Sequence, residues 1–282
     1  MQLFRQKKTL RDYLSAIKTD SKSVGFVPTM GALHEGHLSL VKQAWSANDV
    51  VVVSIFVNPT QFDNPEDLEK YPVNFEEDIE KLRSITDALI VFMPRVDDIY
   101  DKNIKAAVFD FGGLEFEMEG KYREGHFNGV ATIVKKLLEA VQPDRAYFGE
   151  KDYQQLLIVK SLVKLYHLPV HIIACPTQRE AGGLAMSSRN ERLSATMRKK
   201  AAFIYKTLVA ARERFRKKSI REVKVWVADQ FENHTDFSLE YVEIADAETL
   251  RPVQRKAKGK KYRIFIAVYA NHVRLIDNIA LN

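Results

Sequence analysis

Apolar runs and helix-like stretches alternate along the first 176 residues of the chain. Residues 50–57 form a continuous run rich in β-branched side chains, which is typical of a strand buried on both faces. Further strands are predicted at 24–27, 88–93, 106–111, 145–148 and 170–175. Helices are predicted at 38–47, 74–86, 128–141 and 153–166, and Asn74 to Glu77 resembles a capping box. This alternation predicts βαβ units and an α/β fold with a parallel sheet.

The pattern changes after residue 176. Residues 177–190 are loop-like, and two helices are then predicted at 195–216 and 220–233. Strand candidates follow at 239–244, 262–269 and 273–276, close enough to pair through short turns. We therefore predict a second, smaller α+β domain, with the boundary between residues 178 and 179.

Composition limits the class of protein. The chain has 282 residues, of which 46% are hydrophobic, so it can bury a sizeable core. Its apolar runs are much shorter than the ~20 residues of a membrane span, and the N-terminus has no signal-peptide pattern. Its one cysteine, Cys175, lies at the end of an apolar run. We expect a buried, inert thiol and a reducing compartment.

The net charge of +6 is unevenly distributed. Residues 177–282 carry 22 basic and 12 acidic residues, a balance of +10, whereas residues 1–176 have a balance of −4. A basic C-terminal part could hold nucleic acid, could close over a polyphosphate, or could be an ordinary solvated face. The basic runs at 212–218 and 251–261 have few aromatic residues, so nucleic acid is the less favoured partner.

The first candidate for chemistry is the turn after residues 24–27, which reads Pro28-Thr29-Met30-Gly31-Ala32-Leu33-His34-Glu35-Gly36-His37. Helical spacing puts the two histidines on one face of a first helical turn, where backbone N–H groups and the helix dipole favour phosphate. Gly31 and Gly36 let the backbone approach a ligand. The spacing does not fit a zinc protease, and two histidines alone are more often structural.

Three further polar segments follow predicted strands. They read Asn58-Pro59-Thr60-Gln61-Phe62, Gly149-Glu150-Lys151-Asp152-Tyr153-Gln154-Gln155 and Met186-Ser187-Ser188-Arg189-Asn190. Because parallel strands end at one edge of a sheet, we expect these segments to converge with the histidine turn.

Each of these segments supplies a different chemistry. Lys151 could bind an α-phosphate, and Asp152 could cap a helix or hold a ribose hydroxyl. Gln61 and Gln155 suit a hydroxylated carboxylic acid, while Ser187, Ser188 and Arg189 suit phosphate oxygens. Taken singly, each group could also be a solvated helix start, a surface amide or a polar linker.

The four segments together resemble the pantothenate synthetase family (pantoate–β-alanine ligases), and the resemblance extends from about Thr29 to Asn278. It implies a Rossmann-like N-terminal domain that binds nucleotide and pantoate, residues 1–178, and a C-terminal lid, residues 179–282. It implies condensation of pantoate with β-alanine, driven by ATP with Mg²⁺, through a pantoyl adenylate and with release of AMP and pyrophosphate. It also implies a cytoplasmic homodimer, with neither nucleic acid nor membrane as a partner.

The resemblance also assigns residues to functions. The implied catalytic set is His34, His37, Lys151, Ser187, Ser188 and Arg189, with His37 as an acid. The implied ATP-binding residues are Met30, Gly31, Ala32, Leu33, His34, Glu35, Gly36, His37, Gly149, Glu150, Lys151, Asp152, Gln178, Met186, Ser187, Ser188 and Arg189. Gln61, Gln155 and Asn58 would lie at pantoate and β-alanine. No side chain is expected to bind a metal, because ATP carries the Mg²⁺.

Two positions depart from the family pattern. Gln178 stands where an apolar residue, commonly valine, is usual, and Gly182 stands where an aspartate is usual. By the resemblance, these departures bear on side-chain packing at adenine and on the lid hinge, and neither lies in the implied catalytic set.

Three other functions are compatible with parts of the sequence. One is a nucleotidyltransferase acting on a phosphate ester, which Gln61, Gln155 and the C-terminal domain disfavour. Another is a tRNA-charging enzyme, although no anticodon-binding module is evident. The third is an RNA-binding module that uses the basic C-terminal part.

Overall fold

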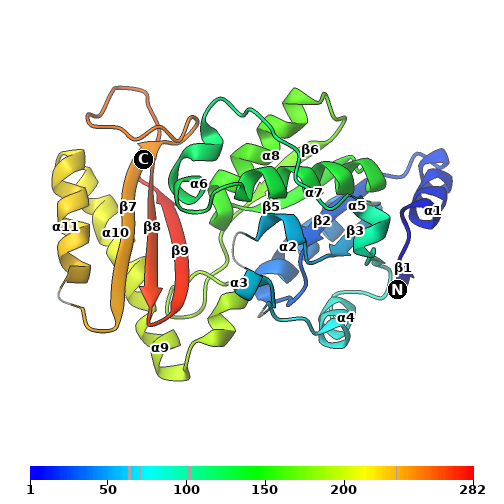
Figure 1. The fold of residues 1–282 in the computed structure, drawn as a ribbon, viewed down its shortest axis with the longest axis horizontal. Coiled ribbons are helices and arrows are strands. Elements are labelled where there is room, and N and C mark those ends of the chain that lie inside the picture. The colour runs from blue at the N-terminus through cyan, green and yellow to red at the C-terminus, as the bar shows by residue number, and fades with distance from the viewer. Residues whose placement is uncertain (63–64, 70, 101–102, 233) are drawn as a thin grey trace. The chain divides into compact units, whose positions relative to one another are not determined.

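The computed structural model describes residues 1–62, 65–69, 71–100, 103–232 and 234–282. The chain divides into two compact units (Figure 1). The first unit comprises Met1–Glu150 and Gln155–Pro176, and the second comprises Lys151–Gln154 and Thr177–Asn282. The assignment of nucleotide and pantoate binding to residues 1–178, and of a lid to residues 179–282, stays a prediction.

A parallel sheet forms the centre of the first unit. Its strands run in the order β1-β4-β3-β2-β5-β6, and all of its strand pairs are parallel, which confirms the predicted α/β class. The strands are β1 (Gln2–Phe4), β2 (Val24–Thr29), β3 (Val50–Ile55), β4 (Ile90–Phe92), β5 (Arg145–Gly149) and β6 (His171–Cys175). Thr29 pairs with Ile55 and Gly149 pairs with Cys175, so these strands end at a common edge.

Helices follow most of these strands. They are α1 (Lys7–Thr19), α2 (Glu35–Ala47), α3 (Pro65–Glu69), α4 (Phe75–Arg83), α5 (Val96–Tyr100), α6 (Met118–Tyr122), α7 (His126–Val141) and α8 (Tyr153–Leu165). Short 3₁₀ turns lie at η1 (Pro59–Gln61), η2 (Leu114–Phe116) and η3 (Glu150–Asp152). Leu38, Val41 and Ala44 of α2 belong to one buried cluster with Val27 of β2 and with alternate residues of β3 (Val51, Val53 and Ile55), and this packing fixes the start of α2 beside the strand ends.

Two sequence expectations for this unit need correction. Residues 106–111 form no strand, because the N–H groups of Ala107 and Phe109 donate to Thr132 Oγ1 and Asn128 Oδ1 of α7 instead of to another strand. The sequence analysis also missed β1, a three-residue edge strand paired with β4, and the helix α1 that follows it.

The second unit contains an antiparallel sheet in the order β7-β8-β9. Its strands are β7 (Phe237–Asp246), β8 (Tyr262–Ala270) and β9 (Val273–Ala280), and the helices α10 (Ala202–Phe215) and α11 (Ile220–Glu232) pack on it (Figure 1). The predicted α+β class is therefore confirmed. The remaining elements are η4 (Ser188–Arg192) and α9 (Ala195–Lys200).

The predicted helix at 195–216 is interrupted. Ala201 has φ −63° and ψ −13°, a 3₁₀-like geometry that ends α9 before α10 begins. The predicted end of the next helix, Asn233, lies outside the described residues.

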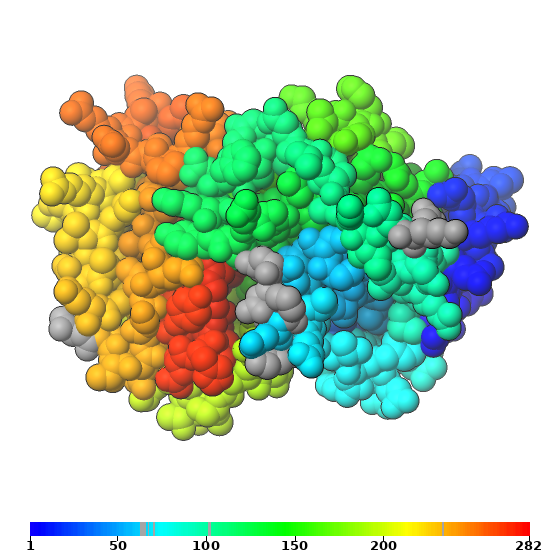
Figure 2. All heavy atoms as spheres, in the orientation of Figure 1, coloured from blue at the N-terminus to red at the C-terminus, as the bar shows by residue number. Residues whose placement is uncertain are grey.

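The surface agrees with the charge pattern. The basic segment at 251–261 is almost entirely exposed and forms part of the visible surface (orange in Figure 2). Within the described part of the chain, every helix is too short or too polar to cross a bilayer.

Candidate active site

The turn after β2 has an unusual backbone. Gly31 and Ala32 both have positive φ, +84° and +49°. The hydroxyl of Thr29 accepts from the Gly31 N–H at 3.2 Å and donates to the Ser54 carbonyl at 2.7 Å. An added Cβ at Gly31 would lie only 3.0 Å from a carboxylate oxygen of Asp78 and 3.1 Å from Ile55. Glycine is therefore required here for both its conformation and its size.

Asp78, on α4, holds this turn closed. Its carboxylate accepts from Ala32 N–H at 2.9 Å and from Leu33 N–H at 2.6 Å. The residue is only 2% exposed, and burial raises the pKa of the carboxyl although both N–H groups oppose the shift. The sequence analysis missed Asp78, because no motif surrounds it.

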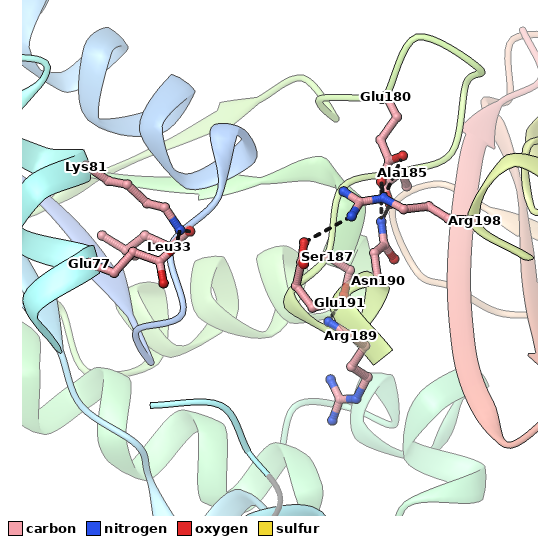
Figure 3. A network of polar contacts seen from close by, with 10 residues as sticks. All are labelled: Leu33, Glu77, Lys81, Glu180, Ala185, Ser187, Arg189, Asn190, Glu191 and Arg198. Atoms are coloured by element: carbon pink, nitrogen blue, oxygen red, sulfur yellow. Dashed lines mark hydrogen bonds and ion pairs between the residues drawn. The ribbon is translucent and has the colours of Figure 1, made fainter. Parts of the chain in front are cut away.

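Lys81 adds a second contact between α4 and the turn. Its ammonium group donates to the Leu33 carbonyl at 2.7 Å and pairs with Glu77 at 2.5 Å (Figure 3). The hydrogen bond from Lys81 lowers the pKa of Glu77. Backbone N–H and C=O groups of the turn are thus bound by two neighbouring side chains of one helix.

The two histidines cap α2. His34 Nδ1 accepts from the Gly36 N–H at 3.1 Å, and His37 Nδ1 accepts from the His34 N–H at 3.4 Å. Their rings lie against each other, with centroids 4.0 Å apart. Because each Nδ1 is an acceptor, each neutral ring carries its proton on Nε2. The helix start therefore combines its own N–H groups with two imidazole donors.

Asn58 is the centre of a second polar cluster, after β3. It is 1% exposed, and its amide nitrogen donates to Gln61 Oε1 at 3.1 Å and to the Gly129 carbonyl at 3.2 Å. Its oxygen accepts from the hydroxyl of Tyr100 at 2.5 Å and from that of Thr60 at 3.2 Å. Asn58 thus fixes the carboxamide of Gln61.

Gln61 connects this cluster to the histidine turn. Its amide nitrogen contacts the Met30 sulfur at 3.0 Å, while its backbone carbonyl lies 2.8 Å from His126 Nδ1. Helix α7 can approach this closely because residue 129 is glycine, where a Cβ would lie 2.1 Å from the Thr60 carbonyl oxygen. The structure therefore brings together the predicted residues Met30, Asn58 and Gln61.

The end of β5 places two more predicted residues at the same sheet edge. Gly149 pairs with Cys175 of β6, and Glu150 follows Gly149 in the chain. Gln155 is half-buried in the first turns of α8.

Cys175 itself is an inert thiol, as expected from the sequence. It is only 2% exposed. Burial, with a smaller contribution from Glu150, raises the pKa of the Cys175 thiol to about 11.

Lys151 and Asp152 belong to the second unit. The Lys151 ammonium lies 3.3 Å from Asp152 Oδ1, and the Lys151 backbone carbonyl accepts from the Asn278 amide at 2.8 Å. Tyr153 donates to the Ala247 carbonyl at 3.0 Å, and the Arg263 guanidinium lies 3.8 Å from the centre of its ring. These contacts attach the lysine-bearing segment to the antiparallel sheet.

The segment before Ser187 folds back on itself. Met186 N–H donates to the Gln178 carbonyl at 3.0 Å, and Arg179 pairs with Ala185 as an isolated antiparallel bridge. Gly182, one of the two departures from the family pattern, is exposed at the tip. Gln178 thus uses its backbone to close this hairpin, which we call the 178–186 hairpin.

The serine turn that follows is held by its neighbours. Ser187 caps η4 by accepting from the Arg189 N–H at 3.3 Å, and Ser188 is buried. Asn190 donates to Glu180 at 2.9 Å and to the Ala185 carbonyl at 3.1 Å, while Arg198 binds the Glu180 carboxylate (Figure 3). Glu180 and Arg198 were not predicted as site residues.

The predicted convergence of all four segments is tested only in part. The residues after β2, β3 and β5 follow neighbouring strand ends of one sheet. Lys151, Asp152, Gln178 and residues 186–189 belong to the second unit, and their approach to that edge stays a prediction.

A parallel sheet with a histidine-capped helix start and the Asn58 and Gln61 amides at its edge is typical of α/β proteins that bind nucleotides. Comparison with known proteins identifies the family. Residues 2–280 match the pantoate–β-alanine ligase family. Pantothenate synthetases of Christiangramia forsetii and Flavobacterium psychrophilum are 56% and 54% identical to this chain, each covering 100% of both sequences.

Solved structures agree with this result. A pantothenate synthetase from Thermus thermophilus superimposes with a TM-score of 0.91 at 41% identity, covering 100% of this chain and 99% of that one. A pantoate–β-alanine ligase from Francisella tularensis gives a TM-score of 0.80 at 39% identity, covering 100% and 98%. The chain belongs to the pantoate–β-alanine ligase family. The predicted activity, ATP-dependent condensation of pantoate with β-alanine, is confirmed by this membership.

Proposed function

We propose that the condensation proceeds through an enzyme-bound pantoyl adenylate. A carboxylate oxygen of pantoate attacks the α-phosphorus of ATP, and the bond from that phosphorus to the bridging oxygen breaks to release pyrophosphate. The β-alanine amine then attacks the acyl carbon, loses a proton, and expels AMP. In this scheme no side chain acts as a nucleophile. The observation that carries the proposal is the His34–His37 cap at the start of α2, whose imidazoles would donate to developing phosphoryl charge.

ATP is proposed to bind along the Gly31 turn and the start of α2. The backbone of residues 30–37 would face the nucleotide, and His34 and His37 would donate from Nε2 to phosphate oxygens. His37 would act as the acid. The Francisella tularensis relative has a structure in complex with β-γ ATP and β-alanine, which supports both ligands for this chain.

The second unit is proposed to supply the remaining phosphate contacts. Lys151 would bind the α-phosphate, and Asp152, Gln178 and Met186 would contact the adenosine part. Gly149 and Glu150, which belong to the first unit, are proposed to contact the adenosine part as well. Ser187, Ser188 and Arg189 would bind the phosphate chain. In Figure 3 the guanidinium of Arg189 points away from the Glu180 cluster.

Pantoate is proposed to bind at Gln61 and Gln155, with Gln61 also near β-alanine. The bonds of Asn58 to Gln61, Gly129, Tyr100 and Thr60 support a refinement of its role. Asn58 would act on the substrates by orienting the Gln61 carboxamide.

Mg²⁺ is proposed to arrive with ATP. Among the described residues, no three His, Cys, Asp or Glu side chains gather closely enough to hold a metal ion. Mg²⁺ binds through phosphate oxygens and water with one or two carboxylates, so the triphosphate can supply most of its ligands.

An isotope experiment tests the intermediate. The enzyme is incubated with ATP, Mg²⁺, β-alanine and pantoate labelled with ¹⁸O in its carboxylate. If the adenylate forms, one ¹⁸O atom appears in AMP for each pantothenate made. Unlabelled AMP, or ADP and phosphate as products, would contradict the mechanism.

Substitution of Lys151 tests the residue assignment. We expect Lys151→Ala to slow pantoate-dependent ATP–pyrophosphate exchange by more than about 10²-fold, because a donor to transition-state charge is typically worth ~2.7–4 kcal/mol. We expect the same of His37→Ala. Near-normal exchange in either variant would contradict its assigned role, and Lys164→Ala on the same stretch of chain serves as the control.

We also propose that the enzyme is a cytoplasmic homodimer that pairs through residues 103–111. The N–H groups of Ala107 and Phe109 donate to Thr132 and Asn128, so this segment is held along α7. Val108 is 88% exposed and Ile104 is 53% exposed in the same segment. Exposed apolar side chains of this kind suit an interface with a second copy.

Light scattering tests the homodimer. We expect a dimer for the unmodified protein and a monomer for Val108→Asp, because the new charge would be buried at the interface. Val225→Asp, at an exposed position of α11, should remain dimeric. A monomeric unmodified protein would contradict the proposal.

A further inference from the structure

Two adjacent residues of β9, Asp277 and Asn278, carry polar groups into the interior of the second unit. They are only 4% and 3% exposed. Buried polar side chains destabilise a fold unless they are hydrogen-bonded. Their partners therefore show what the pair holds in place.

Asn278 binds the segment that carries Lys151. Its amide nitrogen donates to the Lys151 backbone carbonyl at 2.8 Å, and its oxygen accepts from Arg263 Nη1. Arg263 in turn stacks on Tyr153, with its guanidinium 3.8 Å from the ring centre. The chain is thus bound at the Lys151 carbonyl by Asn278 and at the Tyr153 ring by Arg263.

Asp277 binds the 178–186 hairpin. Its carboxylate accepts two hydrogen bonds from Arg179, at 2.6 and 2.9 Å, and one from the Asn278 N–H at 2.7 Å. Arg179 also donates to the Gly183 carbonyl at 3.1 Å and stacks 3.8 Å above the Tyr205 ring. This bidentate pair fixes both position and orientation of the hairpin that leads into Ser187.

We propose that Asp277 and Asn278 are positioning residues that hold Lys151 and the Ser187–Ser188 turn at a fixed separation. Two loops far apart in sequence are bound to consecutive residues of one strand, so neither can shift without breaking a hydrogen bond to a buried side chain. The inference rests on the proposed phosphate contacts of Lys151, Ser187 and Ser188. A displacement of about 1 Å in such groups can reduce a rate by about 10²-fold.

Isosteric substitutions test this proposal. Asn278→Asp keeps the acceptor for Arg263 but removes the donor to the Lys151 carbonyl, and Asn278→Ala removes the donor without adding charge. We expect kcat for pantoate-dependent ATP–pyrophosphate exchange to fall by about tenfold or more, while KM for ATP changes by less than about threefold. Asp277→Asn, which weakens the Arg179 pair, should have the same signature.

A matched control removes a comparable ion pair from the same sheet. Arg274 of β9 donates to Glu240 of β7, and both side chains are mostly buried. Glu240→Gln should leave the exchange rate within about twofold of the unmodified protein. Thermal unfolding of every variant shows whether a loss of activity follows from a loss of folded protein.

A double-mutant cycle separates positioning from general stabilisation. If Asn278 acts through Lys151, then Asn278→Ala should have little further effect in a Lys151→Ala background. An equal fall in exchange rate on adding Asn278→Ala to the original protein and to Lys151→Ala would overturn the inference. Unchanged exchange in Asn278→Asp, Asn278→Ala and Asp277→Asn would also overturn it. If Lys151→Ala itself retains full activity, the proposed function of Lys151 fails instead.

Discussion

At the scale of single residues, Asp78 makes contacts that no sequence motif predicts. It accepts hydrogen bonds from the N–H groups of Ala32 and Leu33, in a turn where Gly31 and Ala32 both have positive φ. The backbone at the start of the proposed phosphate site is therefore shaped by a carboxylate from another helix. The proposed ligand-binding residues form recognisable strings in the sequence, whereas the residues that support them are scattered along the chain.

Replacing Asp78 by asparagine tests this support. Asparagine has one carbonyl oxygen for two N–H groups, so we expect a loss of about 1–3 kcal/mol in the free energy of unfolding, and slower pantoate-dependent exchange. Glu76→Gln, an exposed position on the same helix, is the control. Unchanged stability and exchange in Asp78→Asn would contradict the support.

The same variant has a predicted pH dependence. Burial raises the pKa of the Asp78 carboxyl in the folded protein above its unfolded value. The stability linked to this shift is fully present below the unfolded pKa and is lost as pH rises through the folded pKa. Urea unfolding measures this dependence. The difference in free energy of unfolding between the original protein and Asp78→Asn should become smaller as pH rises from acid. An increase in that difference would contradict the raised pKa.

At the scale of elements, strands and helices were predictable wherever burial alone decides them. Residues 50–57 became β3 because a continuous run rich in β-branched side chains fits a strand covered on both faces, and the shorter strand predicted at 145–148 became β5. The strand predicted at 106–111 was wrong because two of its N–H groups donate to side chains of α7, and such contacts depend on tertiary structure. Strand β1 was missed because three residues carry too little pattern.

Helix α2 has a cap that also belongs to the proposed site, and substitution of His34 can separate the two functions. Asparagine can still accept from the Gly36 N–H, but it has no donor at the position of Nε2. We expect His34→Asn to keep the melting temperature and to lose about 10²-fold in exchange rate. His34→Ala should lose the same activity and about 1 kcal/mol of stability. Equal melting temperatures for both variants would show that His34 does not cap α2.

At the scale of the whole molecule, the second unit is discontinuous in sequence. It includes Lys151–Gln154, which comprise the end of η3 and the first two residues of α8, together with everything from Thr177 onward. A change in hydrophobic pattern after residue 176 falls where the longer part of this unit begins, and the sequence-based boundary between residues 178 and 179 stays a prediction. The inclusion of four residues from η3 and the start of α8 could not be read from the sequence, because it depends on where Tyr153 and Asn278 find their partners.

Replacing Tyr153 by alanine tests that division of the chain. The Tyr153 ring contacts Arg263, and its hydroxyl donates to the Ala247 carbonyl. Losing both contacts should destabilise the second unit by about 2 kcal/mol. Hydrogen exchange should then accelerate in β7 and β8, with β2, β3 and β5 unchanged. Tyr166→Ala is the matched control, because this ring contacts Phe109 and Lys135 of the first unit and its loss should leave β7 and β8 protected. If Tyr153→Ala loosened the parallel sheet instead, Tyr153 would belong to the first unit, and the proposed link from β9 to Lys151 would lose its structural basis.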